Sequence, residues 1–114
     1  MDTNSQPLLA VTPEKLAELV RRIVQSAHPA QIILFGSQAR GDATADSDLD
    51  IMVVEEHVQD AVQEAARLHG LLRGLVLPVE VVVVAKSKFE YWRDTPGNVY
   101  FEAALDGKCL YEAA

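Results

Sequence analysis

The sequence predicts one small domain of the α+β class, because helical and strand-like segments follow one another along a short chain. The chain has 114 residues, 49% of them hydrophobic, which suits a single domain with one buried core. Two stretches carry apolar residues at the three-to-four-residue spacing of an amphipathic helix, and three short apolar runs have the length of buried strands. The expected order of the core is helix, strand, strand, helix, strand.

The first helix is expected to begin after Thr12, which can cap it, with Pro13 in its first turn. Pro29 then ends the helix. Residues 1–11 show no periodicity and are expected to form a flexible leader, so that the domain spans residues 12–114. The apolar face of the helix consists of residues at helical spacing, namely Leu16, Leu19, Val20, Ile23, Val24 and Ala27.

The remaining elements follow from apolar runs and from the residues that interrupt them. Three runs predict strands, and proline or glycine lies beside two of them. An apolar stripe predicts a second long helix, and the weaker pattern near the carboxyl end predicts short elements and a turn. The expected ranges are strands at 31–35, 49–54 and 79–85, a helix at 58–75, a short helix at 87–93, a turn at 95–98, helical turns at 99–105 and an edge strand at 109–111.

The charge of the chain limits its partners. A net charge of −7 and a pI near 4.8 oppose binding to DNA or RNA as bulk polyanions, because such affinity comes mainly from lysine and arginine. A nucleoside triphosphate remains compatible with this charge, since its metal ion brings positive charge to the site. Cys109 is the only cysteine, which excludes an intramolecular disulfide and predicts a small buried residue at this position.

The sequence shows no pattern of a secretory signal or a membrane segment. Residues 1–6 are polar and include the acidic Asp2, where a secretory signal would carry positive charge. The longest apolar run, residues 75–85, is interrupted by Pro78 and Glu80 and is too short to cross a bilayer. We therefore expect a cytoplasmic protein without a membrane partner.

Residues 36–50 join two predicted strands and combine glycines, hydroxyl groups, an arginine and four aspartates. Asp48 and Asp50 are two residues apart, so they are expected on one face at the start of the second strand. Two carboxylates so close repel each other unless a cation or a proton lies between them, and Mg²⁺ prefers such oxygen ligands. Glu80, at the start of the neighbouring strand, would supply a third carboxylate.

The other end of this segment has the composition of a phosphate site. Gly36 and Ser37 follow the first strand, where small residues let backbone amides approach a phosphate closely. Arg40 could reach the same phosphate with its planar guanidinium group. Glycine and serine occur in many turns, so this interpretation depends on the two aspartates that follow at a fixed distance.

A structural interpretation competes with the chemical one in the middle of the segment. Asp46, Ser47 and Asp48 can make a turn whose side chains bond to nearby backbone amides, and this interpretation is favoured for the first two. It is weaker for Asp50, because Asp50 lies inside the predicted strand, where an unpaired carboxylate is costly.

Two known loop motifs are excluded by spacing. An EF-hand loop beginning at Asp46 would need glycine at position 51 and glutamate at position 57, which are isoleucine and histidine here. A Walker A loop beginning at Gly36 would need lysine directly after Gly41, which aspartate follows instead. The segment is therefore neither of these phosphate or calcium loops.

The segment resembles the signature of a known superfamily. Gly36-Ser37, ten further residues and Asp48-Leu49-Asp50 match the Gly-Ser-x10-Asp-x-Asp pattern of the polymerase-β-like nucleotidyltransferases. The fuller strings 36–41 and 47–50 are similar to the minimal nucleotidyltransferase (MNT) branch, and residues 94–100 and 107–112 look like the tail of its bacterial members. Glu80 stands where the family often has its third carboxylate, usually an aspartate.

This resemblance implies both a fold and a chemistry. It implies a small mixed β-sheet flanked by helices and a Mg²⁺-dependent transfer of a nucleotide from ATP. Bacterial members commonly pair, as antitoxins, with a HEPN-domain ribonuclease toxin, and some transfer AMP to a tyrosine of that toxin. The implied roles are triphosphate binding by Gly36, Ser37 and Arg40, and Mg²⁺ binding and catalysis by Asp48, Asp50 and Glu80.

The acceptor is expected to be a protein hydroxyl, since one small domain leaves little room to enclose a second substrate. Two alternatives stay open. One is an antibiotic-modifying transferase that borrows a wall from a dimer partner, and the other is a binding module that masks its partner without catalysis. The oligomeric state is left open. The three histidines are scattered and are expected at the surface, while Tyr91 and Trp92 are expected in the core or at an interface.

Overall fold

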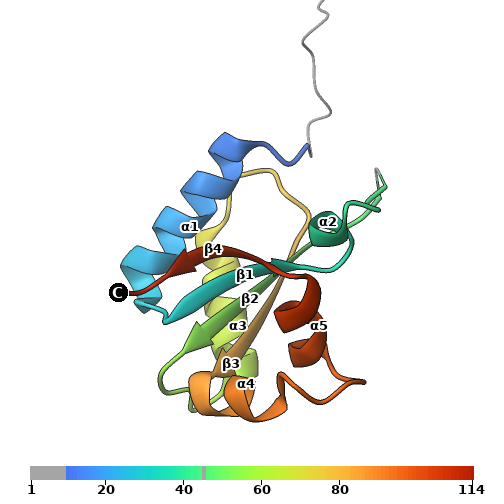
Figure 1. The fold of residues 1–114 in the computed structure, drawn as a ribbon. Helices are drawn as coiled ribbons and strands as arrows, with labels where there is room; N and C mark the ends of the chain where they lie inside the picture. The colour runs from blue at the N-terminus through green and yellow to red at the C-terminus, as the bar shows by residue number, and fades with distance from the viewer. Residues whose placement is uncertain (1–9, 45) are drawn as a thin grey trace, which may run out of the picture.

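The computed structural model describes residues 10–44 and 46–114, which form a four-stranded sheet with helices on both faces (Figure 1). Most of the predicted leader lies outside the described residues, although Val11 packs against the core. The elements in chain order are α1 (Pro13–Ala27), β1 (Gln31–Phe35), α2 (Ser37–Arg40), β2 (Leu49–Glu55), α3 (Ala61–Leu71), β3 (Val79–Ala85), α4 (Lys86–Trp92), α5 (Val99–Asp106) and β4 (Lys108–Glu112).

The sheet is mixed, with the strand order β3-β2-β1-β4. β1 pairs antiparallel with both β2 and β4, whereas β2 and β3 run parallel. This confirms the small mixed sheet flanked by helices and the α+β class. The carboxyl-terminal strand lies at one edge of the sheet, as its short and partly polar sequence predicts.

The two faces of the sheet bury separate sets of apolar side chains. Alternation along β2 sends Ile51 to the face covered by α1 and α3 and Met52 to the face covered by α4 and α5 (Figure 1). Leu19 of α1 and Leu68 of α3 are fully buried against the first face, and Phe89 of α4 packs on the second. A central strand that is buried on both sides explains the uninterrupted apolar sequence after Asp50.

Local signals explain where α1 begins and ends. The Thr12 side chain accepts a hydrogen bond from the backbone N–H of Lys15 at 3.2 Å, and Pro13 occupies the first turn. The helix ends at Ala27, and His28 then adopts a left-handed conformation with φ of 47°. None of the helices in the described part of the chain is long and apolar enough to cross a membrane.

Two expectations need correction, and a third is narrowed. The helix predicted at 58–75 is shorter, Ala61–Leu71; it begins after Asp60, which caps it by accepting from the N–H of Gln63, and ends four residues earlier than expected. Cys109 is exposed rather than buried, because it lies on the edge strand β4. Tyr91 is 74% exposed and Trp92 is 39% exposed, which removes the core and leaves the interface of the two places expected for them.

Candidate active site

The predicted site residues converge where β1 ends and where β2 and β3 begin. Because β1 and β2 are antiparallel, Phe35 at the end of β1 pairs with Asp50 near the start of β2. The parallel pairing of β2 and β3 then sets Asp50 beside Glu80. The backbone N–H of Leu49 donates to the carbonyl of Pro78 at 2.7 Å and ties the two strand starts together. Phe35, Asp50 and Glu80 consequently form a row across three strands, and Gly36 follows Phe35 directly.

Gly36 lies directly against the Asp50 carboxylate. A Cβ atom added at Gly36 would clash with Oδ2 of Asp50, and the glycine backbone has a φ of 73° that other residues rarely adopt. The backbone conformation therefore favours glycine here, and any other residue would also force the Asp50 carboxylate to move. Gly36, which is predicted to bind phosphate, and Asp50, which is predicted to bind the metal ion, are therefore in direct contact.

The segment after Gly36 forms a single helical turn, α2, that was expected to be a loop. The N–H groups of Ala39 and Arg40 donate to the carbonyl of Gly36, both at 3.1 Å, so the hydrogen bonds of the turn begin at that residue. The turn ends at Gly41 with φ of 86°. Four residues are too few to show helical periodicity, and the only available signal was a glycine at each end of the turn.

Asp50 is half-buried, and its surroundings disfavour its negative charge. Burial raises the pKa of Asp50 above its ordinary value, and the nearby carboxylates of Glu80 and then Asp48 raise it further. The guanidinium group of Arg40 opposes this rise only in part. Arg40 itself lies at the surface, where Nε is 3.4 Å from Oδ2 of Asp42. Additional positive charge at this end of the sheet would therefore stabilise ionised Asp50.

The donor atoms at this point suit a divalent cation. Within residues 10–44 and 46–114, no three acidic, histidine or cysteine side chains are grouped closely enough to form a finished metal site. Asp50 and Glu80 are nevertheless strand neighbours, and the exposed Asp48 contributes to the charge around Asp50. Carboxylate oxygens that repel one another are the hard ligands that Mg²⁺ prefers, so the residues present fit this ion.

The residues just before Asp48 form a hydrogen-bonded turn. The backbone N–H of Thr44 donates to Oγ of Ser47 at 2.8 Å, and the N–H of Ser47 donates to the carbonyl of Thr44 at 3.1 Å. Asp46 also donates its N–H to Oγ1 of Thr44 at 3.3 Å. This confirms the structural interpretation for Ser47, whose side chain bonds to a backbone amide, whereas Asp46 takes part in the turn through its backbone N–H.

A shallow hollow of about 490 Å³ lies between α3 and β3, and His69, Val79 and Val81 are among the residues that line it. Val79 and Val81 belong to the face of the sheet covered by α3, whereas Glu80, which alternates with them, shares the opposite face with Asp50. The hollow therefore lies on the other side of the sheet from the Asp50 and Glu80 carboxylates.

Comparisons with known proteins bear on the fold and on the family of the chain. No curated protein matches the sequence. A crystal structure described as that of a candidate nucleotidyltransferase from Sulfolobus solfataricus superposes with a TM-score of 0.57, at 17% identity over 97% of this chain and 93% of that one. A chain from a mutant form of the toxin–antitoxin pair MntA–HpeT also gives 0.57, at 22% identity over 91% of this chain and 75% of that one.

These two likenesses show the fold, and a sequence model of one family goes further. The model of the nucleotidyltransferase domain matches residues 14–104, a range that contains all of the first helix except Pro13, the Gly36-to-Asp50 segment and Glu80. The match therefore spans most of the chain and every element that carries the site. The chain belongs to the nucleotidyltransferase domain family.

Proposed function

We propose that the protein is a Mg²⁺-dependent adenylyltransferase that transfers AMP from ATP to a hydroxyl group, a tyrosine, of a partner toxin of the HEPN class, and so acts as an antitoxin. The observation that carries the proposal is the convergence of Gly36, Asp50 and Glu80 at the point where β1 ends and β2 and β3 begin. Family membership supports the transfer of a nucleotide. The toxin partner is suggested by the likeness to a chain of a toxin–antitoxin pair.

Each predicted site residue has a part in this reaction. Gly36 and Ser37, at the start of α2, would hold the triphosphate through backbone N–H groups, with Arg40 assisting from the last residue of the turn. Asp48, Asp50 and Glu80 would hold Mg²⁺, which neutralises charge on the phosphates when it is bound. Glu80 would accept the proton of the attacking hydroxyl, because it lies at the outer end of the row.

The chemical step is one displacement at phosphorus. The acceptor oxygen forms a bond to the α-phosphorus of ATP, and the bond between that phosphorus and the β-phosphate oxygen breaks. Pyrophosphate leaves with the electron pair, and the hydroxyl proton passes to Glu80. The chain itself contributes position and fixed charge, which is how catalysis of phosphoryl transfer generally works.

The test uses ATP labelled at the α-phosphate, Mg²⁺ and the protein encoded beside this one. We expect label on a tyrosine of the partner with the wild-type protein, and none with Asp48→Asn or Asp50→Asn. Asp46→Asn is the matched control, because Asp46 belongs to the exposed turn, and it should transfer label normally. Label on a small-molecule antibiotic instead of the partner would favour the small-molecule transferase.

A binding module is the second candidate, and exposed apolar side chains favour it. Tyr91 and Leu105 are 74% and 66% exposed on α4 and α5, as residues of a contact surface would be. In that case the partner is neutralised without label transfer, and Asp48→Asn and Asp50→Asn neutralise it as well as the wild type. This combination of results would show that catalysis is not the function.

A further inference from the structure

We propose that the partner polypeptide binds by adding an extended segment, as a further antiparallel strand, to the outer edge of β3, with its acceptor tyrosine opposite Glu80. This inference rests on the proposed nucleotidyl transfer and adds how the second substrate is held. It starts from the sheet order, in which β3 lies at one edge and carries Glu80. A segment paired with this edge would lie directly beside a residue of the candidate site.

The hydrogen bonds between β2 and β3 show which backbone groups of β3 remain available. The N–H of Leu49 donates to the carbonyl of Pro78, and the pairing is parallel, so Glu80 directs its backbone groups towards β2. Val79 and Val81 alternate with it and direct their N–H and C=O groups outward. In the part of the chain that the structure describes, β3 is paired on the β2 side only. Both valines are partly exposed, so a new strand can reach these groups.

The two edges of the sheet differ in the features that prevent further pairing. β4 carries a bulge in its pairing with β1 and two exposed charged residues, Lys108 and Glu112. Bulges and charges are the usual means by which edge strands are kept from further pairing. β3 pairs with β2 in unbroken register and contains five valines, with Glu80 as its one charged residue. The edge of β3 is therefore the one that can take another strand.

A tyrosine opposite Glu80 would lie on the face of the sheet that holds the candidate site. Residues directly opposite each other on neighbouring strands point to the same face, with Cβ atoms about 5 Å apart. Glu80 is exposed and lies beside Asp50 on the face that also carries Met52. In an antiparallel segment the tyrosine would form a non-hydrogen-bonded pair with Glu80, the arrangement in which side chains come closest. The phenolic side chain would therefore lie beside the carboxylates.

The residues on either side of the tyrosine would lie on the opposite face of the sheet. There Val79 and Val81 border the shallow hollow beside α3, where Ala65 and Ala66 are small. Apolar side chains of the segment would pack into this hollow, while their backbone groups exchange hydrogen bonds with the two valines. Main-chain bonds give such a complex its affinity, and alternate side chains give it specificity. A small molecule has no such backbone, so this edge favours a polypeptide acceptor.

The test uses the peptide acetyl-Thr-Val-Tyr-Val-Thr-amide, whose β-branched residues favour an extended conformation. Titrated without ATP into the ¹⁵N-labelled full-length chain, it should shift the amide signals of Val79 and Val81, and the titration gives its Kd. N-methylation of either peptide valine removes an N–H that faces β3, and should raise the Kd about tenfold, the effect of one lost hydrogen bond. N-methylation of the peptide tyrosine is the matched control, because that N–H faces away from β3, and it should leave the Kd unchanged.

Any other pattern of Kd values, or an absence of shifts at Val79 and Val81, would overturn the inference. Shifts at these valines that appear when the protein alone is concentrated would assign the edge to a second copy, and would overturn it too. If label reaches the partner protein but the peptides fail this test, the proposed function stands without the inference. If no label is transferred, the proposed function fails, and the Kd values alone decide whether the edge of β3 takes a tyrosine-bearing strand.

Discussion

The absence of a side chain at Gly36 affects both the backbone conformation and the position of the Asp50 carboxylate. The residue needs a positive φ and also leaves the space that the Asp50 carboxylate occupies. Any side chain would displace either the turn α2 or the carboxylate. In the sequence Gly36 resembles an ordinary turn residue, but in the structure it also allows the Asp50 side chain to take its observed position.

We expect Gly36→Ala to destabilise the protein more than Gly41→Ala. Both glycines have positive φ, which costs alanine about 1 kcal/mol, but a Cβ at Gly41 meets no atom within 4 Å. At Gly36 the Asp50 side chain must also leave its rotamer, which adds about 0.5–1.5 kcal/mol. Urea unfolding of the two variants measures the difference, and equal losses of stability would contradict the contact between Gly36 and Asp50.

Glu55, at the other end of β2, has an unusual environment for a carboxylate. Burial raises its pKa to about 7, and the neighbouring carboxylate of Glu64 adds to the rise. Arg67 pairs with Glu64 at 2.8 Å and lowers the pKa of Glu64 to about 2. Within the described residues, the buried Oε2 of Glu55 accepts no hydrogen bond. When Glu55 is protonated, its carboxyl group can donate a hydrogen bond to the Glu64 carboxylate, and Oε2 is then no longer an unsatisfied buried atom.

The stability of the protein should therefore fall as the pH rises towards 8. The pKa of Glu55 is about 7 in the folded state against an ordinary 4.5, so the folded state binds more protons between these values. Glu64, with its lowered pKa, contributes stability above pH 4.5 that is lost only in more acidic solution. Glu55→Gln should remove the loss between pH 5 and 8 and gain about 1 kcal/mol at pH 8 after allowance for solvent screening.

Unfolding curves at pH 5 and pH 8 test this expectation. Glu56→Gln is the control, because Glu56 lies next in sequence but is exposed and only 3.8 Å from Lys86 at the surface. It should keep the pH dependence of the wild type. A Glu55→Gln variant that loses as much stability as the wild type over this range would show that Glu55 is not the proton carrier.

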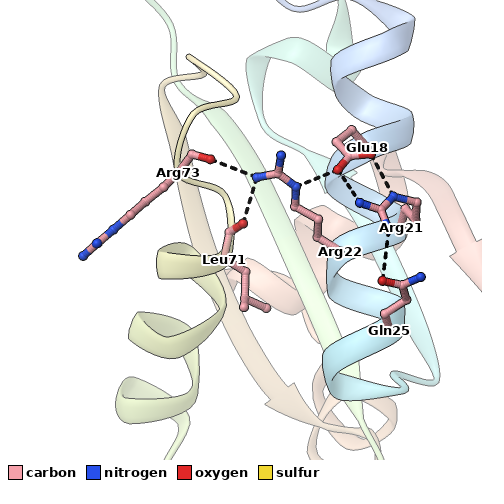
Figure 2. Close-up of polar contacts among 6 residues, drawn as sticks. All are labelled: Glu18, Arg21, Arg22, Gln25, Leu71 and Arg73. Carbon is pink, nitrogen blue, oxygen red and sulfur yellow. Dashed lines mark hydrogen bonds and ion pairs between the residues drawn. The ribbon is translucent and has the colours of Figure 1, made fainter.

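At the scale of elements, Arg22 joins α1 to the carboxyl end of α3 (Figure 2). Its Nη1 donates to the carbonyls of Leu71 and Arg73 at 3.0 and 2.9 Å, and its Nε bonds to Glu18 at 2.7 Å. These carbonyls lie at the end of α3, where helical partners run out. Arg21 shares Glu18 but otherwise bonds to Gln25 on α1 itself.

We expect Arg22→Ala to cost about 1–3 kcal/mol, because it removes charged donors from two carbonyls between helices. Arg21→Ala removes a bidentate pair with the same Glu18, but that pair is exposed and should change stability little. Thermal unfolding of both variants gives the comparison. Similar melting temperatures for the two would show that the link between the helices adds nothing to stability.

At the scale of the molecule, repulsion among the carboxylates of the candidate site lowers the stability of the folded sheet. The mixed sheet brings the starts of β2 and β3 together and so sets Asp50 beside Glu80 in partial burial. The raised pKa of Asp50 means that its ionised form is held at a cost in the absence of a cation. The fold maintains this arrangement because apolar contacts on both faces of β2 outweigh the repulsion at its end.

Asp50→Asn should therefore raise the melting temperature without ligand and remove the response to Mg²⁺ and ATP. Asparagine keeps the shape and removes the repelling charge. In the wild type, ligand at 100 times its Kd should add about 2.7 kcal/mol, and removal of Mg²⁺ with EDTA should abolish the gain. Differential scanning fluorimetry measures both effects. A variant that is destabilised without ligand, or that still responds to Mg²⁺ and ATP, would contradict this view of Asp50.

Much of the fold could be read from local signals in the sequence. Thr12, Pro13 and Pro29 bracket α1, and Pro78 precedes β3, so both elements have the predicted bounds. Capping, proline geometry and apolar spacing act within a few residues, which is why one sequence suffices to detect them. The spacing of Gly36, Asp48 and Asp50 likewise identified the segment that contains the candidate site.

Tertiary structure alone decided which of these residues meet. Strand pairing, which depends on contacts between distant segments, sets Asp50 beside Glu80 and against Gly36. The position of β4 at the edge of the sheet likewise leaves Cys109 exposed. The sequence by itself determined the positions of the longer helices, the strands and the segment from Gly36 to Asp50, because these depend on neighbours along the chain. The register of the sheet decided the composition of the site, because side chains far apart in sequence meet only in the folded protein.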